Sequence, residues 1–160
     1  MAKSKEEKTN VMRTLEQKKI PYTAHTYDPA GPIDGVSVAQ TLGQLPERVF
    51  KTLVTKGASG AYYVFDIPVA ENLDLKKAAK AVGEKSVAML PQKELLPLTG
   101  YVHGGCSPVG MKKQFPTVCH ETALLYGTVC VSAGKIGHQV ECDPNALIAL
   151  LRAKTADVIV

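Results

Sequence analysis

The stretch VFKTLVTKGASGAYYVFDIPV, residues 49–69, decides the fold. Both of its ends are rich in β-branched and aromatic residues, whereas Gly57 to Gly60 in the middle is turn material. Two apolar runs joined by such a turn are typical of a β-hairpin. We therefore predict strands at Val49–Thr55 and Ala61–Val69 that pair with each other.

Outward from the hairpin, helices and strands are mixed without a regular βαβ alternation. Apolar spacing and capping signals predict helices at Ser4–Lys19, from Ser37 as N-cap to Gly43, at Asn72–Val82 before Gly83, at Gln92–Leu96, and after Asp143 with Pro144 as first helical residue. Short strands are predicted at Tyr22–Tyr27, Thr117–His120, Ala123–Tyr126, Val129–Ser132 and Val140–Cys142, with loops at Asp28–Gly35 and Pro97–Gly110. This mixture predicts an α+β fold, with helices around a mixed, curved or partly closed sheet.

Length and composition indicate one ordinary globular domain. The 160 residues fit a single domain, 1–160, that buries a core without metal ions or disulfides. The four cysteines are widely spaced and form no C-x-x-C pair, so we expect them to be reduced. The polar start MAKSKEEKTN is unlike a signal peptide, and no apolar run approaches the ~20 residues that cross a membrane. We expect a cytoplasmic protein without membrane contact. A net charge of +4 is a weak indication of a nucleic-acid partner.

The most unusual segment is GYVHGGCSPVG, residues 100–110. The adjacent glycines Gly104 and Gly105 permit backbone conformations that other residues avoid. Ser107 followed by Pro108 has the pattern of an N-cap and a first helical residue. Such a loop would aim several backbone N–H groups at one point and bind an oxyanion, a carbonyl oxygen or a phosphate. The alternative is a tight loop that only turns the chain.

Lys51 is the second candidate, in the first strand of the hairpin. Strand alternation places Lys51 on one face with Val49 and Leu53. It places Thr52 on the other face with Phe50 and Val54. A lysine among apolar neighbours would project into a cavity and carry charge to a substrate. The alternative, favoured from the residues alone, is a lysine whose ammonium reaches out to solvent.

The segment VSAGKIG, residues 131–137, joins two predicted strands. It contains Ser132, Gly134 and a lysine but departs from the P-loop pattern G-x-x-x-x-G-K-[ST], which argues against ATP hydrolysis. A plain turn is the stronger interpretation. The four histidines show no triad spacing, and there is no G-x-S-x-G elbow. Cys119, His120, His138 and Cys142 match no usual zinc pattern, so we expect neither a metal site nor a cofactor.

At these residues the chain resembles the YbaK/EbsC family, which is related to the editing domain of bacterial prolyl-tRNA synthetase. The similarity is carried by VFKTLV (49–54), the loop at 100–110, VSAGKIG (131–137) and LDLKKAAKAVG (73–83), and it extends from about Val11 to Ala156. It implies a small barrel-like mixed sheet with helices around it. It also implies an enzyme that hydrolyses misacylated tRNA, in this branch Cys-tRNA(Pro).

The resemblance also implies a set of site residues. The family's lysine falls on Lys51, its glycine-rich loop on Gly104 to Pro108, its serine-glycine turn on Ser132 to Gly134, and its pocket tyrosine on Tyr27. We expect Lys51, Gly104, Gly105 and Ser107 to be catalytic, and Tyr27, Thr52, Pro108, Ser132 and Gly134 to bind substrate. Two departures concern amino-acid specificity: Ala133 stands where relatives often have glycine, and Gln139 stands near a position that is acidic in some cysteine-specific members.

The implied mechanism needs no protein nucleophile, because an aminoacyl ester is already activated. In cysteine-specific relatives the thiol of the attached cysteine is thought to attack its own carbonyl. The implied partners are the aminoacylated 3′ end of tRNA and prolyl-tRNA synthetase. The alternatives are an Ala-tRNA(Pro) deacylase that uses water, and a non-catalytic module that binds an aminoacyl or nucleotide end.

Overall fold

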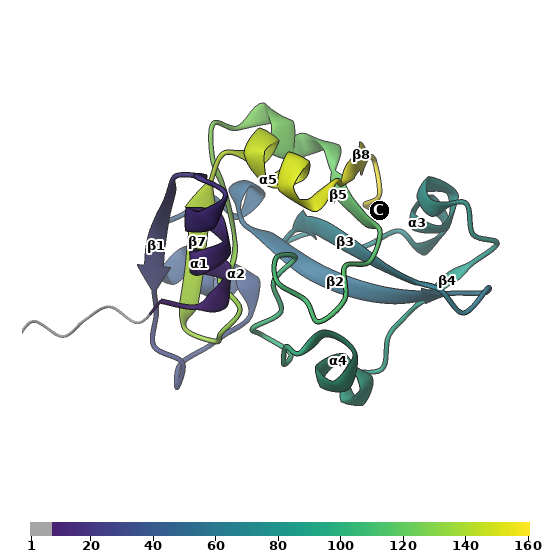
Figure 1. Ribbon diagram of the computed structural model, residues 1–160, viewed down its shortest axis with the longest axis horizontal. Coiled ribbons are helices and arrows are strands. Elements are labelled where there is room, and N and C mark those ends of the chain that lie inside the picture. The colour runs from purple at the N-terminus through teal and green to yellow at the C-terminus, as the bar shows by residue number, and fades with distance from the viewer. Residues whose placement is uncertain (1–7) are drawn as a thin grey trace, which may run out of the picture.

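The computed structural model describes residues 8–160, and its strands form two sheets (Figure 1). The larger sheet has five strands in the order β4-β2-β3-β5-β8, and the smaller has three in the order β1-β7-β6. An isolated parallel bridge between Val49 and Cys130 connects them. The α+β class is therefore confirmed. The expectation of a barrel-like sheet is not, because neither sheet of residues 8–160 closes on itself.

The predicted hairpin forms the middle of the larger sheet. β2 (Phe50–Gly57) pairs antiparallel with β3 (Tyr62–Pro68), and Gly57 donates a backbone hydrogen bond to Ala61 across the turn. β4 (Val87–Met89) adds antiparallel to β2, while β5 (Thr117–His120) and β8 (Lys154–Ala156) extend the sheet in parallel beyond β3. The hairpin prediction is confirmed, whereas β4 and β8 were not predicted because each has only three residues.

The smaller sheet is antiparallel throughout. β7 (His138–Cys142) lies between β1 (Tyr22–Thr26) and β6 (Val129–Ser132). α1 (Asn10–Gln17) and α5 (Pro144–Leu151) share its core, to which they contribute Val11, Met12, Leu15, Leu147 and Leu151. Of the predicted helix Ser4–Lys19, residues 4–7 lie outside the described part of the chain. Asp143 caps α5 as expected, and its side chain accepts a hydrogen bond from Asn145 N.

The remaining helices pack against the larger sheet and near the bridge between the two sheets. α3 (Leu75–Val82) packs Ala78 and Ala79 against β3 and β5 and ends at Gly83, as predicted. α4 (Gln92–Thr99) continues through Pro97, which was assigned to a loop. α2 (Gly35–Thr41) is capped by Asp34 and not by Ser37, since the Asp34 carboxylate accepts a hydrogen bond from Ser37 N. The short 3-10 helix η1 (Pro46–Arg48) follows α2.

Two further predictions are wrong. Ala123–Tyr126 is not a strand, because residues Glu121–Leu125 form the 3-10 helix η2, in which Ala123 is buried and Leu124 and Leu125 are exposed. Ser107 and Pro108 begin no helix: the chain from Tyr101 to Pro116 is irregular. None of the helices in residues 8–160 has the length and apolar character needed to span a membrane.

Candidate active site

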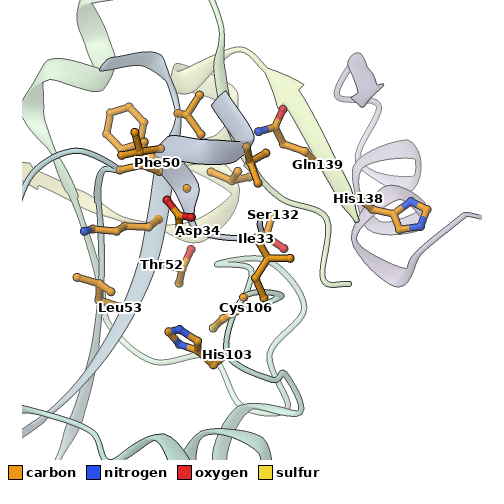
Figure 2. Close-up of a pocket in the computed structure, with 18 of the residues that line it drawn as sticks. Ile33, Asp34, Phe50, Thr52, Leu53, His103, Cys106, Ser132, His138 and Gln139 are labelled. Atoms are coloured by element: carbon orange, nitrogen blue, oxygen red, sulfur yellow. The ribbon is translucent and has the colours of Figure 1, made fainter. Parts of the chain in front are cut away.

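A cavity of about 370 Å³ lies where the two sheets meet. Its walls come from the start of β2, the loop and first turn that lead into α2, the glycine-rich loop, and the adjoining ends of β6 and β7 (Figure 2). Five of the nine predicted site residues line it: Tyr27, Lys51, Thr52, Gly104 and Ser132. Segments that are distant in the sequence therefore converge on one hollow.

Lys51 is half-buried at this cavity. Burial lowers the pKa of its ammonium group, and the charge of Glu71 acts in the opposite direction. Within residues 8–160 the ammonium has no hydrogen bond or ion pair at contact distance. All residues from Val49 to Leu53 line the cavity, so the strand alternation does not by itself decide which of them has access. The structure thus favours a cavity-lining Lys51 over a purely solvated one.

Thr52 connects the cavity to a carboxyl group buried behind it. Its hydroxyl donates a 2.6 Å hydrogen bond to Asp66 Oδ1 on the neighbouring strand. Thr52 and Asp66 are direct cross-strand partners, and only 2% of the Asp66 surface is exposed. Burial raises the pKa of Asp66 to about 7, although the hydrogen bond from Thr52 opposes this shift. Sequence analysis did not identify Asp66, because a single acidic residue in an apolar strand has no motif.

The glycine-rich loop contributes Gly104 to the cavity lining. Its other predicted site residues are buried and do not line the cavity: Gly105, Ser107 and Pro108. Gly104 has φ +91°, and a Cβ there would lie 2.9 Å from Ile33 Cδ1. The Gly105 N–H is already engaged by the Val102 carbonyl at 3.0 Å. Ser107 is fully buried, with its hydroxyl accepting a hydrogen bond from Val109 N, and Pro108 is buried beside it. Of the N–H groups expected to converge, that of Gly105 is thus engaged within the loop, and Pro108 has none.

In the turn after β6, too, one predicted site residue lines the cavity and the other does not. Ser132 lines the cavity, and its hydroxyl accepts a hydrogen bond from Gly134 N at 3.1 Å. Gly134 faces the interior, where a Cβ would lie 3.0 Å from Tyr101 Cε1 and 3.1 Å from Val11 Cγ2. Gly134 therefore shapes the turn that presents Ser132, and it does not line the cavity itself.

Asp34 is a cavity residue that sequence analysis missed. Asp34 lines the cavity as an exposed residue, and Figure 2 draws its side chain among those around the hollow. The hydrogen bonds from Ser37 hold its pKa below the ordinary value, so it is a carboxylate at neutral pH. The available signal was the D-G-V-S pattern, in which an aspartate precedes the first residue of a helix. The residues that line the cavity therefore include a half-buried lysine and an exposed aspartate.

Gln139 and Cys106 complete the polar lining. Gln139 is 4% exposed and forms a reciprocal amide pair with Gln44, with distances of 2.7 and 3.2 Å. Burial, and then the charge of Asp66, raise the pKa of the Cys106 thiol to about 12. Cys106 is therefore a protonated thiol at neutral pH and a poor nucleophile.

The histidines and cysteines do not form the zinc set considered from the sequence. His120 Nδ1 accepts a hydrogen bond from Val158 N, and burial raises the pKa of the Cys119 and Cys142 thiols. A different group, His25, Cys130 and Glu141, has ligand atoms within 4.8 Å of one another. The Glu141 carboxylate is already bound by His25 at 2.8 Å, by Arg48 at 3.0 Å and by Thr128. This cluster is outside the cavity and joins η1 to the smaller sheet through the side chains of Arg48 and Glu141.

Comparison with known proteins finds a family model, a relative and solved structures that match most of this chain. Residues 34–150 match the model of the family described as "Aminoacyl-tRNA editing domain". A protein of Enterococcus faecalis named "Putative Cys-tRNA(Pro)/Cys-tRNA(Cys) deacylase EbsC" is 48% identical, over 99% of this chain and 98% of its own. A solved structure of "a putative trans-editing enzyme for prolyl tRNA synthetase" is 29% identical, covers 94% of both chains and has a TM-score of 0.81. The hypothetical protein APE2540, at 23% identity and a TM-score of 0.86, shares the fold.

Proposed function

Since the chain belongs to the aminoacyl-tRNA editing domain family, we propose that it is a trans-editing hydrolase that removes a wrongly attached amino acid from tRNA, namely cysteine from Cys-tRNA(Pro). The observation that carries the proposal is the joint presence of Lys51, Gly104 and Asp34 around one small cavity. A hollow of about 370 Å³ suits an aminoacyl group with its terminal ribose. The rest of the tRNA would lie outside it.

The charges in the cavity match the parts of an aminoacyl ester. The ammonium of Lys51 would hold the ester near its carbonyl or terminal ribose, where negative charge develops during the reaction. The Asp34 carboxylate would bind the α-ammonium group of the amino acid. The backbone of Gly104 would approach the carbonyl closely, because this residue has no side chain in the way. Ser132 and Tyr27 would form walls of the amino-acid pocket.

The reaction proceeds by substrate assistance in this proposal. The thiol of the attached cysteine attacks the carbonyl carbon, the C–O bond to the ribose breaks, and the departing ribose oxygen takes up the proton that the thiol gave up. The cyclic thioester released in this way is opened by water. The buried, protonated thiol of Cys106 supports a mechanism in which the protein supplies no cysteine nucleophile. Lys51 and the loop backbone would then supply positioning and charge stabilisation alone.

Two alternatives predict different results in one experiment. An Ala-tRNA(Pro) deacylase would use water, since alanine has no thiol. A binding module would hold the aminoacyl end without turnover. The test is a panel of Cys-, Ala- and Ser-tRNA(Pro) beside Cys-tRNA(Cys), with amino-acid release measured at substoichiometric protein. Multiple turnovers on the cysteine substrates are expected. Release from Ala-tRNA(Pro) alone would support the water mechanism, and no turnover on any substrate would contradict the enzyme.

Prolyl-tRNA synthetase is the partner that this function suggests. The family relationship and the similarity to a trans-editing structure support it. A docked synthetase would supply tRNA selection to a chain whose cavity accommodates only the 3′ end. Addition of the synthetase to the deacylation assay is expected to increase discrimination between tRNA(Pro) and tRNA(Cys). Unchanged discrimination would argue that this chain acts alone.

A further inference from the structure

Asp66 is a buried acid that the proposed chemistry does not use. Its Oδ1 accepts the hydrogen bond from the Thr52 hydroxyl, whereas its Oδ2 is buried and has no hydrogen-bond partner within residues 8–160. A carboxyl group with an unsatisfied oxygen is costly in a protein interior. The one hydrogen-bond partner of this carboxyl group is Thr52, which lines the cavity.

Among the titratable groups of this cluster, Asp66 is the one that titrates near neutral pH. Three elements face it: Thr52 on β2, Cys119 on β5, and Cys106 in the glycine-rich loop. Burial raises the pKa of both thiols far above neutrality, to about 12 for Cys106, so both stay uncharged. Burial also brings the pKa of Asp66 itself to about 7.

The two protonation states of Asp66 impose opposite directions on the Thr52 hydroxyl. A carboxylate can only accept, so Thr52 must donate to it and can offer only lone pairs to the cavity. A protonated carboxyl can donate to the Thr52 oxygen, and the Thr52 O–H is then free to turn toward the cavity. The ionisation of a residue that does not touch the substrate thus determines whether Thr52 is an acceptor or a donor there.

We propose that ionised Asp66 is a positioning residue that fixes Thr52 as a hydrogen-bond acceptor for the attacking group of the substrate. The attacking thiol or water carries a hydrogen, so it needs an acceptor to align it with the carbonyl carbon. This inference rests on the proposed deacylase function. It predicts that Asp66 favours catalysis only at pH values where it is charged.

The test compares kcat/KM of the wild type and of Asp66→Asn on Cys-tRNA(Pro) from pH 5.5 to 8.5. Asparagine is neutral and resembles the protonated carboxyl, so the wild-type to variant ratio should be near one at pH 5.5. It should rise to roughly tenfold above pH 8, about the effect of one oriented hydrogen bond. The ratio cancels the titration of the substrate amine and thiol, which both enzymes share. Asp74→Asn, which changes an N-cap carboxylate of α3, is the control and should give a flat ratio near one.

Thr52 variants test whether Asp66 acts through the Thr52 hydroxyl. In a Thr52→Val background the Asp66→Asn change should have no further effect at any pH, whereas Thr52→Ser keeps a hydroxyl and should keep the pH-dependent ratio. A flat wild-type to Asp66→Asn ratio with turnover intact would overturn this inference and leave the deacylase function standing. A pH-dependent effect of Asp66→Asn in the Thr52→Val background would also overturn it. An inactive wild type would remove the proposed function and this inference together.

Discussion

A Cβ atom on Gly105 would lie 3.1 Å from the backbone nitrogen of Ile136, so the glycine-rich loop and the turn after β6 touch through their backbones. This contact joins the two segments that present Gly104 and Ser132 to the cavity. Backbone atoms cannot move aside as a flexible side chain can. The role of Gly105 in this geometry is close approach, since its N–H is already engaged by Val102.

Gly105→Val is expected to lower kcat/KM for deacylation by roughly 100-fold, because it would force the loop and the turn apart. A misplacement of about 1 Å at a site costs rates of this order. Steady-state deacylation, with circular dichroism to check folding, measures the effect. Gly127→Ala is the matched control, since a Cβ there meets nothing within 4 Å and the residue is exposed. A Gly105→Val enzyme with nearly wild-type activity would refute this account of the loop.

Lys51→Ala is expected to reduce kcat/KM by roughly 100-fold or more, in line with the loss of one group that stabilises developing negative charge. Lys56→Ala is its control. Lys56 lies on the same strand but is exposed, and its ammonium is 5.7 Å from the Tyr62 ring. Both variants are measured at saturating and at limiting substrate. Similar activities for the two would show that the half-buried lysine has no special role.

Asp34→Asn tests recognition of the amino group. Asparagine caps a helix about as well as aspartate, so α2 should persist while the charge is lost. We expect kcat/KM on Cys-tRNA(Pro) to fall roughly two- to fivefold, since exposed ion pairs are weak. N-acetyl-Cys-tRNA(Pro) has no α-ammonium, so its hydrolysis should not respond to the substitution.

The comparison with Asp74→Asn makes this test specific, because Asp74 caps α3 through hydrogen bonds from Lys76 N and Lys77 N. This variant should leave hydrolysis of both substrates unchanged. Equal losses on the acetylated and free substrates for Asp34→Asn would mean that Asp34 acts through the helix and not through the amine.

Site residues could be predicted from the sequence where they lie within a recognisable motif. Lys51 was identified through VFKTLV and lines the cavity, although the residues alone favoured an ammonium group that reaches out to solvent. Ser107 and Pro108 have the residue types of a helix start, but the loop buries them and uses the Ser107 hydroxyl to bind Val109 N. Asp34 and Asp66 could not be found in this way. One is recognised only when α2 is placed against β2, and the other only when β2 and β3 are in register.

Cys106→Ala is expected to keep deacylase activity within a few-fold of the wild type. The thiol lines the cavity, but burial raises its pKa to about 12, so almost no thiolate is present at pH 7. The activity of the variant on Cys-tRNA(Pro) is the measurement, with iodoacetamide treatment of the wild type as a second probe. A folded but inactive Cys106→Ala protein would refute substrate assistance and indicate a protein nucleophile.

Asp66 should also make stability depend on pH in a direction opposite to that of a typical surface carboxylate. Burial raises its folded-state pKa from 3.8 to about 7, so the folded protein holds the proton more tightly than the unfolded chain does. The stability that this group contributes is fully present below about pH 4, is lost as the pH rises toward 7, and changes little above that.

Between pH 5 and pH 7.5 the wild type should therefore lose roughly 2–3 kcal/mol of unfolding free energy relative to Asp66→Asn, at about 1.4 kcal/mol per pH unit. Urea unfolding of both proteins at the two pH values measures this difference, and the shared carboxylates cancel between them. A constant difference would mean that Asp66 is ionised in both the folded and the unfolded protein throughout this range. In that case pH could not change the direction of the Thr52 hydroxyl, and the stability data would contradict the predicted pH dependence of the Asp66→Asn ratio independently of any measurement of activity.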